Sequence, residues 1–316
     1  MVSGAEPAKV SGITPAAPGV ALMSLEDLFC DIDDFCRLFL PAWHRQLLTD
    51  SARQRQRASR LTLSEIMTIL IYFHQSQYRN FKAFYLLHLS RNGRGEFPNL
   101  LSYTRFVALI PTALMPMCIY LHTRRGEDTG IAFIDATSRV VCHNRRIHSH
   151  NVFKKVARRG KTSMGWFYGF KLHRVVNERG ELLAFQITPG NIDDRRPVPE
   201  LTQGLTGKLV GDRGYISQQL FKVLWDRGLQ WITKIRKNMR NKLMPLADKL
   251  LLRKRAIIET INDQLKNIQQ VEHTRHRSLV NAMVNVLAAL VAYTHQPCKP
   301  SLNLSKNELK LLTCQA

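Results

Sequence analysis

The chain has 316 residues, of which 45% are hydrophobic. This composition excludes a disordered protein and leaves room for a large core and about two domains. The formal net charge is +22, and the first 50 residues hold three basic and seven acidic side chains, so the positive excess lies in the remainder. Such an excess favours nucleic acid as a partner, with a soluble protein that has one basic face as the alternative.

The chain carries no sequence signal for an oxidising or membrane environment. Its six cysteines form no Cys-x-x-Cys pair, which favours reduced thiols and argues against a zinc ribbon. We see no secretory signal peptide in the first 24 residues. The longest apolar stretch, Leu279–Tyr293, is too short to span a bilayer and predicts a buried helix. We therefore expect a cytoplasmic, nucleoid-associated protein with no membrane partner.

The N-terminal third is predicted to be helical. Residues 1–23 are rich in Ala, Gly, Pro and Ser and are expected to be a disordered segment, in which Met1 or Met23 is the true start. Residues 24–125 repeat apolar side chains at steps of three and four. Pro41 is expected to end or kink the first helix, and the second helix is expected to begin at Thr62 or Ser64.

Two interpretations of this helical domain remain open. Its aromatic residues are either the core of a compact bundle or part of a DNA-docking domain, in which a helix-turn-helix is conceivable. The second interpretation assigns phosphate contacts to a short basic segment and the arginine that follows it. These residues are Arg53, Arg55, Arg57 and Arg60.

From about residue 130 the pattern changes to short β-rich runs. They lie at 131–141, 166–176, 182–188, 208–210 and 229–235, with helical patterns at 196–205 and 217–227 between the later ones. The second and third runs are joined by a hairpin-like turn that ends at Gly180. The order predicts a mixed α/β domain over 126–296, followed by a C-terminal tail over 297–316.

Two aspartates occur in or next to predicted strands. Asp135 lies in the apolar run from Ile131, where its charge costs several kcal/mol unless it is compensated. Asp212 follows the apolar pair Leu209-Val210, and the glycines on each side of Asp212-Arg213 permit a tight exit from the strand. Ligands of open α/β sheets bind at this end of the strands.

A third acid, Glu259, lies on a predicted helix. Asn262, Asp263 and Lys266 share its face, beside an apolar face of isoleucines and Leu265. An ordinary solvated helix explains Glu259 taken alone, and Asp263 is an alternative third ligand. Taken together, three hard oxygen ligands suit Mg²⁺ or Mn²⁺. Two such ions at one site serve an in-line phosphoryl displacement.

Basic and aromatic residues surround the proposed site. From Arg139 to Asn177 there are ten Lys or Arg and no acidic residue, which is typical of a surface that follows phosphates. A loop between strands is expected to bind phosphate through Lys154, Lys155, Arg158, Arg159 and Lys161, with Lys171 and Arg213 as further DNA contacts. Trp166 and its two neighbours are expected in the strand core rather than stacked on a base.

Two other groups admit more than one role. Asp193 and Asp194 favour a turn or a helix cap over a place beside the metals. The histidines His143, His148, His150 and His173 favour phosphate contact or plain surface over zinc, because no spaced cysteines accompany them.

Several stretches resemble bacterial insertion-sequence DDE transposases of the RNase H-like superfamily, most closely the insertion sequence 982 family. They cover nearly the whole chain from Ser24 to Thr294, and the pair around Gly165 and Gly211 is the most specific. The stretches are Leu63–His74, Phe97–Tyr103, Gly165–His173, Thr188–Asp194, Gly211–Ile216 and the Glu259 helix.

The resemblance implies an RNase H-like mixed five-stranded sheet with flanking helices, preceded by an all-helical domain. It implies Asp135, Asp212 and Glu259 as catalytic and metal-binding residues, with Mg²⁺ as cofactor, and Lys266 as a DNA contact. The expected activity is cleavage at the 3′ ends of terminal inverted repeats in double-stranded DNA and joining to target DNA, by a homodimer. A structure-selective nuclease and a non-catalytic DNA-binding regulator are the alternatives.

Overall fold

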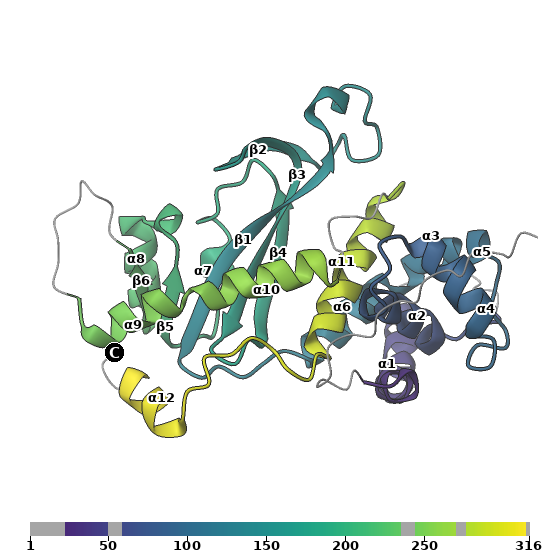
Figure 1. Ribbon diagram of the computed structural model, residues 1–316, viewed down its shortest axis with the longest axis horizontal. Coiled ribbons are helices and arrows are strands. Elements are labelled where there is room, and N and C mark those ends of the chain that lie inside the picture. The colour runs from purple at the N-terminus through teal and green to yellow at the C-terminus, as the bar shows by residue number, and fades with distance from the viewer. Residues whose placement is uncertain (1–22, 50–58, 235–243, 270–275, 314–316) are drawn as a thin grey trace, which may run out of the picture.

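A computed structural model describes residues 23–49, 59–234, 244–269 and 276–313. It shows a helical part and an α/β part that lie side by side (Figure 1). Arg53, Arg55 and Arg57 lie outside the described residues, as does almost all of the predicted disordered segment 1–23.

The helical part begins with two helices whose starts follow from the sequence. Helix α1 (Leu25–Thr49) buries Leu28, Ile32 and Cys36 on one face. It continues through Pro41 to Thr49, so this proline does not end the helix, and the alternative of a kink stays a prediction. Helix α2 (Leu63–Gln75) begins at a capping box, because Thr62 and Glu65 satisfy each other's backbone N–H groups.

Short helical segments complete this part. They are α3 (Phe81–Ala83), a π-helical turn (Phe84–Leu89), α4 (Ser90–Asn92), α5 (Tyr103–Leu109), a 3₁₀ turn (Ile110–Ala113) and α6 (Leu114–Thr123). Phe73, Phe84, Tyr85 and Phe106 are buried, so these aromatics form core, as the first interpretation predicts. The stretch Tyr103–Thr123 has the length and apolar character of a membrane span, but its buried side chains pack in this core.

The six strands form one mixed sheet. They are β1 (Ile131–Cys142), β2 (Arg158–Thr162), β3 (Gly165–Asn177), β4 (Leu182–Pro189), β5 (Gly207–Gly211) and β6 (Leu229–Thr233). Strands β4, β3 and β1 are antiparallel neighbours, and β1, β5 and β6 are parallel. The spatial order β4-β3-β1-β5-β6 is that of an RNase H-like sheet, as expected.

Strand β2 is an addition to the five predicted strands. It pairs with the first five residues of β3, along the edge where β4 pairs with later ones. The sequence analysis placed Arg158, Arg159 and Lys161 in a loop, because Arg-Arg-Gly-Lys-Thr lacks alternating apolar residues. Cationic side chains are typical of an edge strand, which they protect from pairing with other chains.

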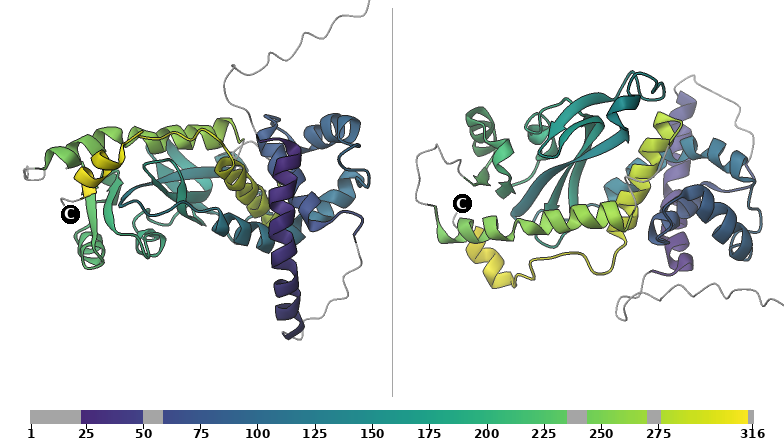
Figure 2. Two further views of the ribbon diagram at one scale, coloured as in Figure 1. Left: turned by 90° about the horizontal axis from the view of Figure 1, so that it is seen from below. Right: turned by 45° about the horizontal axis from the view of Figure 1, so that its top comes forward.

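Helices cover both faces of the sheet. One face carries α8 (Gln218–Trp225) and the short α7 (Val198–Leu201), which pack on Ile134, Val175 and Trp231. The predicted helix over 196–205 is four residues long, because Pro197 and Pro199 restrict it and Gly204 adopts φ +80°. The other face carries α9 (Leu246–Lys254) and α10 (Ala256–Asn267), which lies along the sheet in Figure 2.

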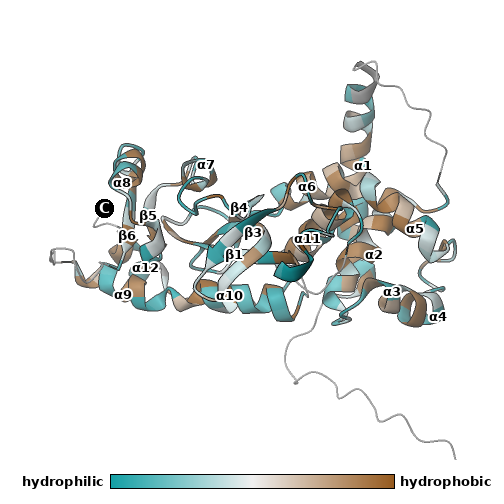
Figure 3. Cartoon of the chain, turned by 90° about the horizontal axis from the view of Figure 1, so that it is seen from above, coloured by the Kyte–Doolittle hydropathy of each residue, from teal (hydrophilic) through white to brown (hydrophobic). Residues whose placement is uncertain are grey.

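Helix α11 (Leu279–Thr294) connects the two parts of the molecule. It is buried, as its apolar sequence predicts, and it packs against α2 and α6 rather than across the sheet. Figure 3 shows the hydrophobic residues gathered where these three helices meet. Helices before and after the sheet therefore share one core, and a boundary near residue 125 stays a prediction.

The segment after α11 returns to the sheet. The Leu302 N–H donates to the Glu178 carbonyl (2.8 Å), and Tyr293 Oη donates to the Gly180 carbonyl (2.6 Å). A Cβ at Gly180, where φ is +73°, would meet the Pro300 carbonyl oxygen at 2.1 Å. The β3–β4 turn therefore needs glycine both for its backbone and for this contact. Helix α12 (Lys306–Thr313) follows.

A buried ion pair fixes α9 to the sheet. Lys208 of β5 and Asp248 of α9 lie 2.9 Å apart, with side-chain exposures of 1% and 4%. Each charge is costly to bury alone, so the pair constrains α9 to this position over β5.

Asp248→Ala is expected to lower the free energy of unfolding by about 3–5 kcal/mol, because it leaves the Lys208 ammonium buried without its counter-charge. The double variant Lys208→Met/Asp248→Leu should recover most of the loss. Urea unfolding measures both, with exposed Lys249→Ala as a control expected within about 0.5 kcal/mol of the wild type. A small effect of Asp248→Ala would contradict this role.

Candidate active site

Asp135 lies at the centre of the sheet, facing α10. Asn262 of α10 donates its side-chain N–H to Asp135 Oδ2 (2.6 Å). Arg174 of β3 is the cross-strand partner of Asp135, and it donates to Thr137 Oγ1 (2.7 Å) and to the Asn262 side-chain oxygen. Burial raises the pKa of Asp135 above its ordinary value, and Arg174 opposes that rise. The carboxylate is therefore compensated only in part.

Asp212 leaves β5 at the same end of the sheet. The parallel pairing of β1 and β5 ends at Phe133 and Val210. Two residues further on are Asp135, still in β1, and Asp212, the first residue after β5. In register, they emerge at one level on one face. A Cβ at Gly211 would lie 2.3 Å from the Trp231 ring, so close packing explains this glycine. Asp212 is exposed and begins a 3₁₀ turn, Arg213–Tyr215.

Tyr215 is a site residue that the sequence analysis missed. It is buried, its ring lies 5.8 Å from that of Trp231, and its hydroxyl has no hydrogen-bond partner within the described ranges. Its pKa is raised well above the ordinary value by burial and by the charges of Asp135, Asp194 and Asp212. Asp135, Asp194 and Asp212 therefore all lie close enough to the Tyr215 hydroxyl to disfavour its ionisation. The Gly-Asp-Arg-Gly-Tyr run was the available signal.

Glu259 lies on α10, one turn before Asn262. Ile257, Ile258, Ile261 and Leu265 are buried, so the predicted apolar face is confirmed. Glu259 itself is exposed and accepts a hydrogen bond from Arg255 (2.6 Å). Asn262, one turn further on, is the residue that reaches Asp135. Asp263 is exposed and Lys266 is half-buried.

The three proposed ligands do not form a closed metal cage. Among the described residues, no group of three or more His, Cys, Asp or Glu side chains is arranged to hold a metal ion. Asp135 and Asp212 converge from neighbouring strands, whereas Glu259 is held by Arg255. The third carboxylate would have to leave that ion pair to join the other two, and the triad stays a prediction.

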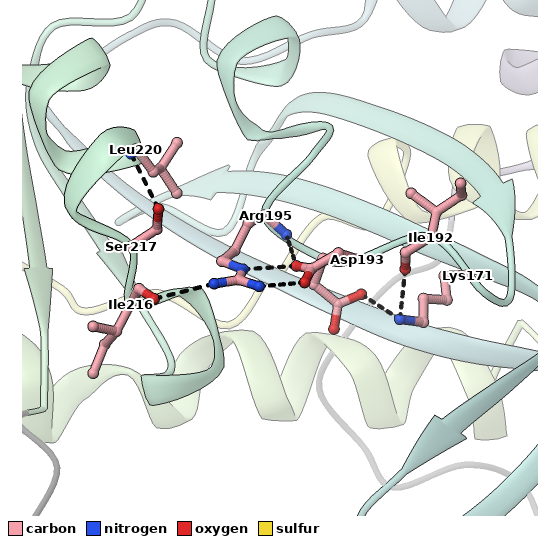
Figure 4. A network of polar contacts seen from close by, with 8 residues as sticks. Lys171, Ile192, Asp193, Arg195, Ile216, Ser217 and Leu220 are labelled. Atoms are coloured by element: carbon pink, nitrogen blue, oxygen red, sulfur yellow. Dashed lines mark hydrogen bonds and ion pairs between the residues drawn. The ribbon is translucent and has the colours of Figure 1, made fainter.

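The loop after β4 is tied to the Asp212 loop. Asp193 accepts from the Arg195 N–H (2.9 Å) and from its guanidinium, which is the predicted turn role. Arg195 also donates to the Ile216 carbonyl (3.4 Å), as Figure 4 shows. Lys171 of β3 holds the same loop through the Ile192 carbonyl and Asp194 (2.9 and 2.8 Å). These contacts connect the loop after β4 to strand β3 and to the loop that contains Asp212 and Tyr215.

The predicted DNA contacts differ in exposure. Lys154, Lys155, Arg158, Arg159, Lys161 and Arg213 are exposed. The ammonium group of Lys171 is instead held inside the protein by Asp194, which gives it a structural role. Trp166 is 62% exposed beneath Lys161, so its assignment to the strand core is wrong, whereas Phe167 and Tyr168 are buried as expected.

The histidines occupy separate environments. His173 is buried beside Thr188 Oγ1 (2.8 Å), and burial lowers its pKa to about 4. His143 and His148 are exposed, and His150 stacks on Phe153.

Comparison with known proteins finds one matching domain family and a similar solved structure. Residues 125–279, which include all three acids, match the family described as "Transposase DDE domain". No curated protein matches the chain. Among solved structures it is similar to a piggyBac transposase synaptic complex with hairpin DNA, at 11% identity and a TM-score of 0.40, covering 92% of this chain and 80% of that one. The sheet with Asp135 and Asp212 thus lies within the region that matches the DDE transposase domain.

Arg195→Ala is expected to speed amide hydrogen exchange over 212–217 by several-fold, because a part-buried hydrogen bond to the Ile216 carbonyl contributes about 1 kcal/mol. Hydrogen exchange followed by mass spectrometry measures it. The exposed neighbour Arg196 provides the matched control, Arg196→Ala, which should leave this segment unchanged. Equal exchange in the two variants would show that Arg195 does not hold the Asp212 loop.

The raised pKa of Asp135 predicts a pH-dependent cost of its charge. The folded protein holds this proton more tightly than the unfolded chain does, so the stabilisation is present below the unfolded pKa and is lost as pH rises through the folded pKa. Asp135→Asn removes that loss. Its free energy of unfolding, relative to the wild type without metal, should therefore rise between about pH 4 and pH 7. Urea titrations at both pH values test this, and a falling difference would contradict it.

Proposed function

We propose that this protein is a DNA transposase of the insertion sequence 982 type, which cuts the 3′ ends of an element at its terminal inverted repeats and joins them to target DNA. The observation that carries the proposal is the strand pairing that brings Asp135 of β1 and the end of β5 before Asp212 side by side, with Asn262 of α10 bonded to Asp135. The match of residues 125–279 to transposase DDE domains supports it.

The donor set fits a hard divalent cation. Asp135 and Asp212 supply carboxylate oxygens, and the raised pKa of Asp135 shows that its negative charge is under-compensated in the protein alone. Such donors suit Mg²⁺ or Mn²⁺. Asp135, Asp212 and Glu259 would hold two such ions. When bound, the metal supplies Lewis-acid activation of the attacking oxygen and stabilises the leaving oxygen.

The residues of the chain position the reactants. Asn262 and Arg174 orient the Asp135 carboxylate, and the Arg195 contact fixes the loop that presents Asp212. In cleavage, a water oxygen bonds to phosphorus while the bond to the 3′ oxygen breaks and that oxygen takes a proton. In joining, the freed 3′ hydroxyl attacks a target phosphodiester in the same way, and a second 3′ oxygen leaves.

The basic surface is proposed as the DNA track. Lys154, Lys155, Arg158, Arg159 and Lys161 project from the β2 region, where their charge attracts phosphates and makes binding salt-dependent. Arg213 follows Asp212 directly, and Lys266 lies two turns beyond Glu259. We propose a homodimer acting on double-stranded DNA in the cytoplasm, at the nucleoid.

Asp135→Ala, Asp212→Ala and Glu259→Ala are each expected to reduce Mg²⁺-dependent cleavage of a duplex carrying the element's end by more than about a hundredfold, while DNA binding persists. Asp263→Ala is the matched control on the same helix and should retain activity. Gel analysis of 3′-end cutting and of joined products measures both steps.

Each outcome of this experiment assigns a function. Wild-type cleavage by Asp212→Ala would overturn the site. Loss of activity in Asp263→Ala but not in Glu259→Ala would move the third ligand to Asp263. Cutting without joining would identify a nuclease, and DNA binding without any metal-dependent cutting would identify a regulator.

A further inference from the structure

A second basic recess lies beyond the site, where β1 ends. It is a pocket of about 680 Å³ between the end of β1, the segment that follows it, Phe170 of β3 and the start of α11. The segment after β1 is the excursion at the top of Figure 1. Neither the proposed metal ligands nor the Lys154–Lys161 track contribute to its walls.

The pocket combines a cationic rim with an apolar floor. Arg139, Arg145 and Arg146 line it, and no acidic residue does. Burial lowers the pKa of His276 in its wall to about 4, so that histidine is neutral at pH 7 and the arginines carry the charge. Phe153 and Met283 contribute apolar surface. A ligand that matches this lining has an anionic group and a flat, weakly polar body.

The floor already holds one flat stacking arrangement. The His150 ring stacks on Phe153, with centroids 5.5 Å apart and 13° between the planes, and Tyr168 meets it edge-on at 6.2 Å. The His150 Nε2 atom is buried and has no hydrogen-bond partner in the described part of the chain. Aromatic surface and arginine together are the usual surroundings of an unstacked base.

The position of the pocket relates it to the proposed chemistry. Arg139 follows Asp135 by four residues on β1 and lies on the same face of the sheet. At about 3.3 Å per residue the two Cα atoms are roughly 13 Å apart. Along a B-form strand, at about 3.4 Å per step, this is about four nucleotides. A strand whose scissile phosphate lies at Asp135 can therefore place a nearby nucleotide at the pocket.

We propose that this pocket binds one unpaired nucleotide of the DNA strand, with its phosphate on the arginine rim and its base on the Phe153 and Met283 floor. The inference rests on the proposed function for its substrate class, and it adds a base-binding subsite to that function. Binding of an unpaired base compensates part of the free energy of unstacking near the cleavage point.

A cysteine in the wall permits a test on the unmodified protein. Cys142 lines the pocket as a half-buried free thiol, whereas Cys30, Cys118 and Cys298 are exposed elsewhere. A short oligothymidylate should slow alkylation of Cys142 by a small maleimide at least several-fold and leave the other three unchanged. An abasic oligomer of equal length should protect less. Peptide mass spectrometry measures each thiol. Bound oligothymidylate without selective protection of Cys142 would overturn the proposal.

A filled pocket provides the complementary variant. Met283→Trp occupies the floor without changing charge, and Met115→Trp adds the same side chain at an exposed position of α6. The wild type and Met115→Trp should bind oligothymidylate about tenfold more tightly than the abasic oligomer, since stacking contributes 1–3 kcal/mol per base. Met283→Trp should lose this preference and keep its affinity for the abasic oligomer. Retention of the preference would contradict base binding here.

The base-binding pocket and the transposase activity can be tested independently of each other. Asp135→Ala should abolish cleavage and keep Cys142 protection, because oligonucleotide binding in the pocket requires no metal. Cleavage that depends on the acids, combined with unprotected Cys142, would overturn the pocket and leave the transposase function standing. Protected Cys142 in a protein that does not cleave DNA would support the pocket and overturn the activity.

Discussion

The structure depends on placing a carboxylate in the central strand of its sheet. Asp135 is half-buried and directly follows the fully buried Phe133 and Ile134 of β1, where an isolated charge is costly. The protein compensates it with an amide from Asn262 and with the cross-strand Arg174, which is itself 1% exposed. Because Asn262 bonds to both, α10 is held with one particular face toward β1. That face also carries Glu259, so the network that stabilises the first acid determines where the third one lies.

The charges of Asp248 and Asp135 are compensated in different ways. Lys208 and Asp248 neutralise each other directly at 2.9 Å and fix α9. Asp135 has an amide as its closest partner, and its pKa stays raised even with Arg174 nearby. The first arrangement leaves no demand for a further cation, whereas the second does. This difference is consistent with the proposed role of Asp135 as a metal ligand and with a structural role for Asp248.

The features that could be predicted from the sequence are those set by the local spacing of residues. The five strands of the RNase H-like sheet, the cap at Thr62 and the buried face of α10 all follow from the spacing of apolar and capping residues. Strand β2 was missed because pairing with β3, and not its own side chains, makes it a strand. Tyr215 was missed because two of the three carboxylates that affect it, Asp135 and Asp194, are distant in sequence. The Arg255 ion pair with Glu259 follows from helical spacing, but whether it persists depends on the occupant of the site.

The helical part is joined to the active-site helix by a specific contact as well as by shared core. His74 of α2 donates from Nδ1 to the Gln269 carbonyl (2.5 Å), two residues beyond α10. Burial lowers the pKa of His74 to about 4, so the ring stays neutral at pH 7 and this one tautomer satisfies the carbonyl. In the middle of α10, Asn262 bonds to Asp135 of β1. The helix that carries Glu259 is thus held between α2 and the central strand, and a displacement of the helical bundle would shift the third carboxylate relative to the other two.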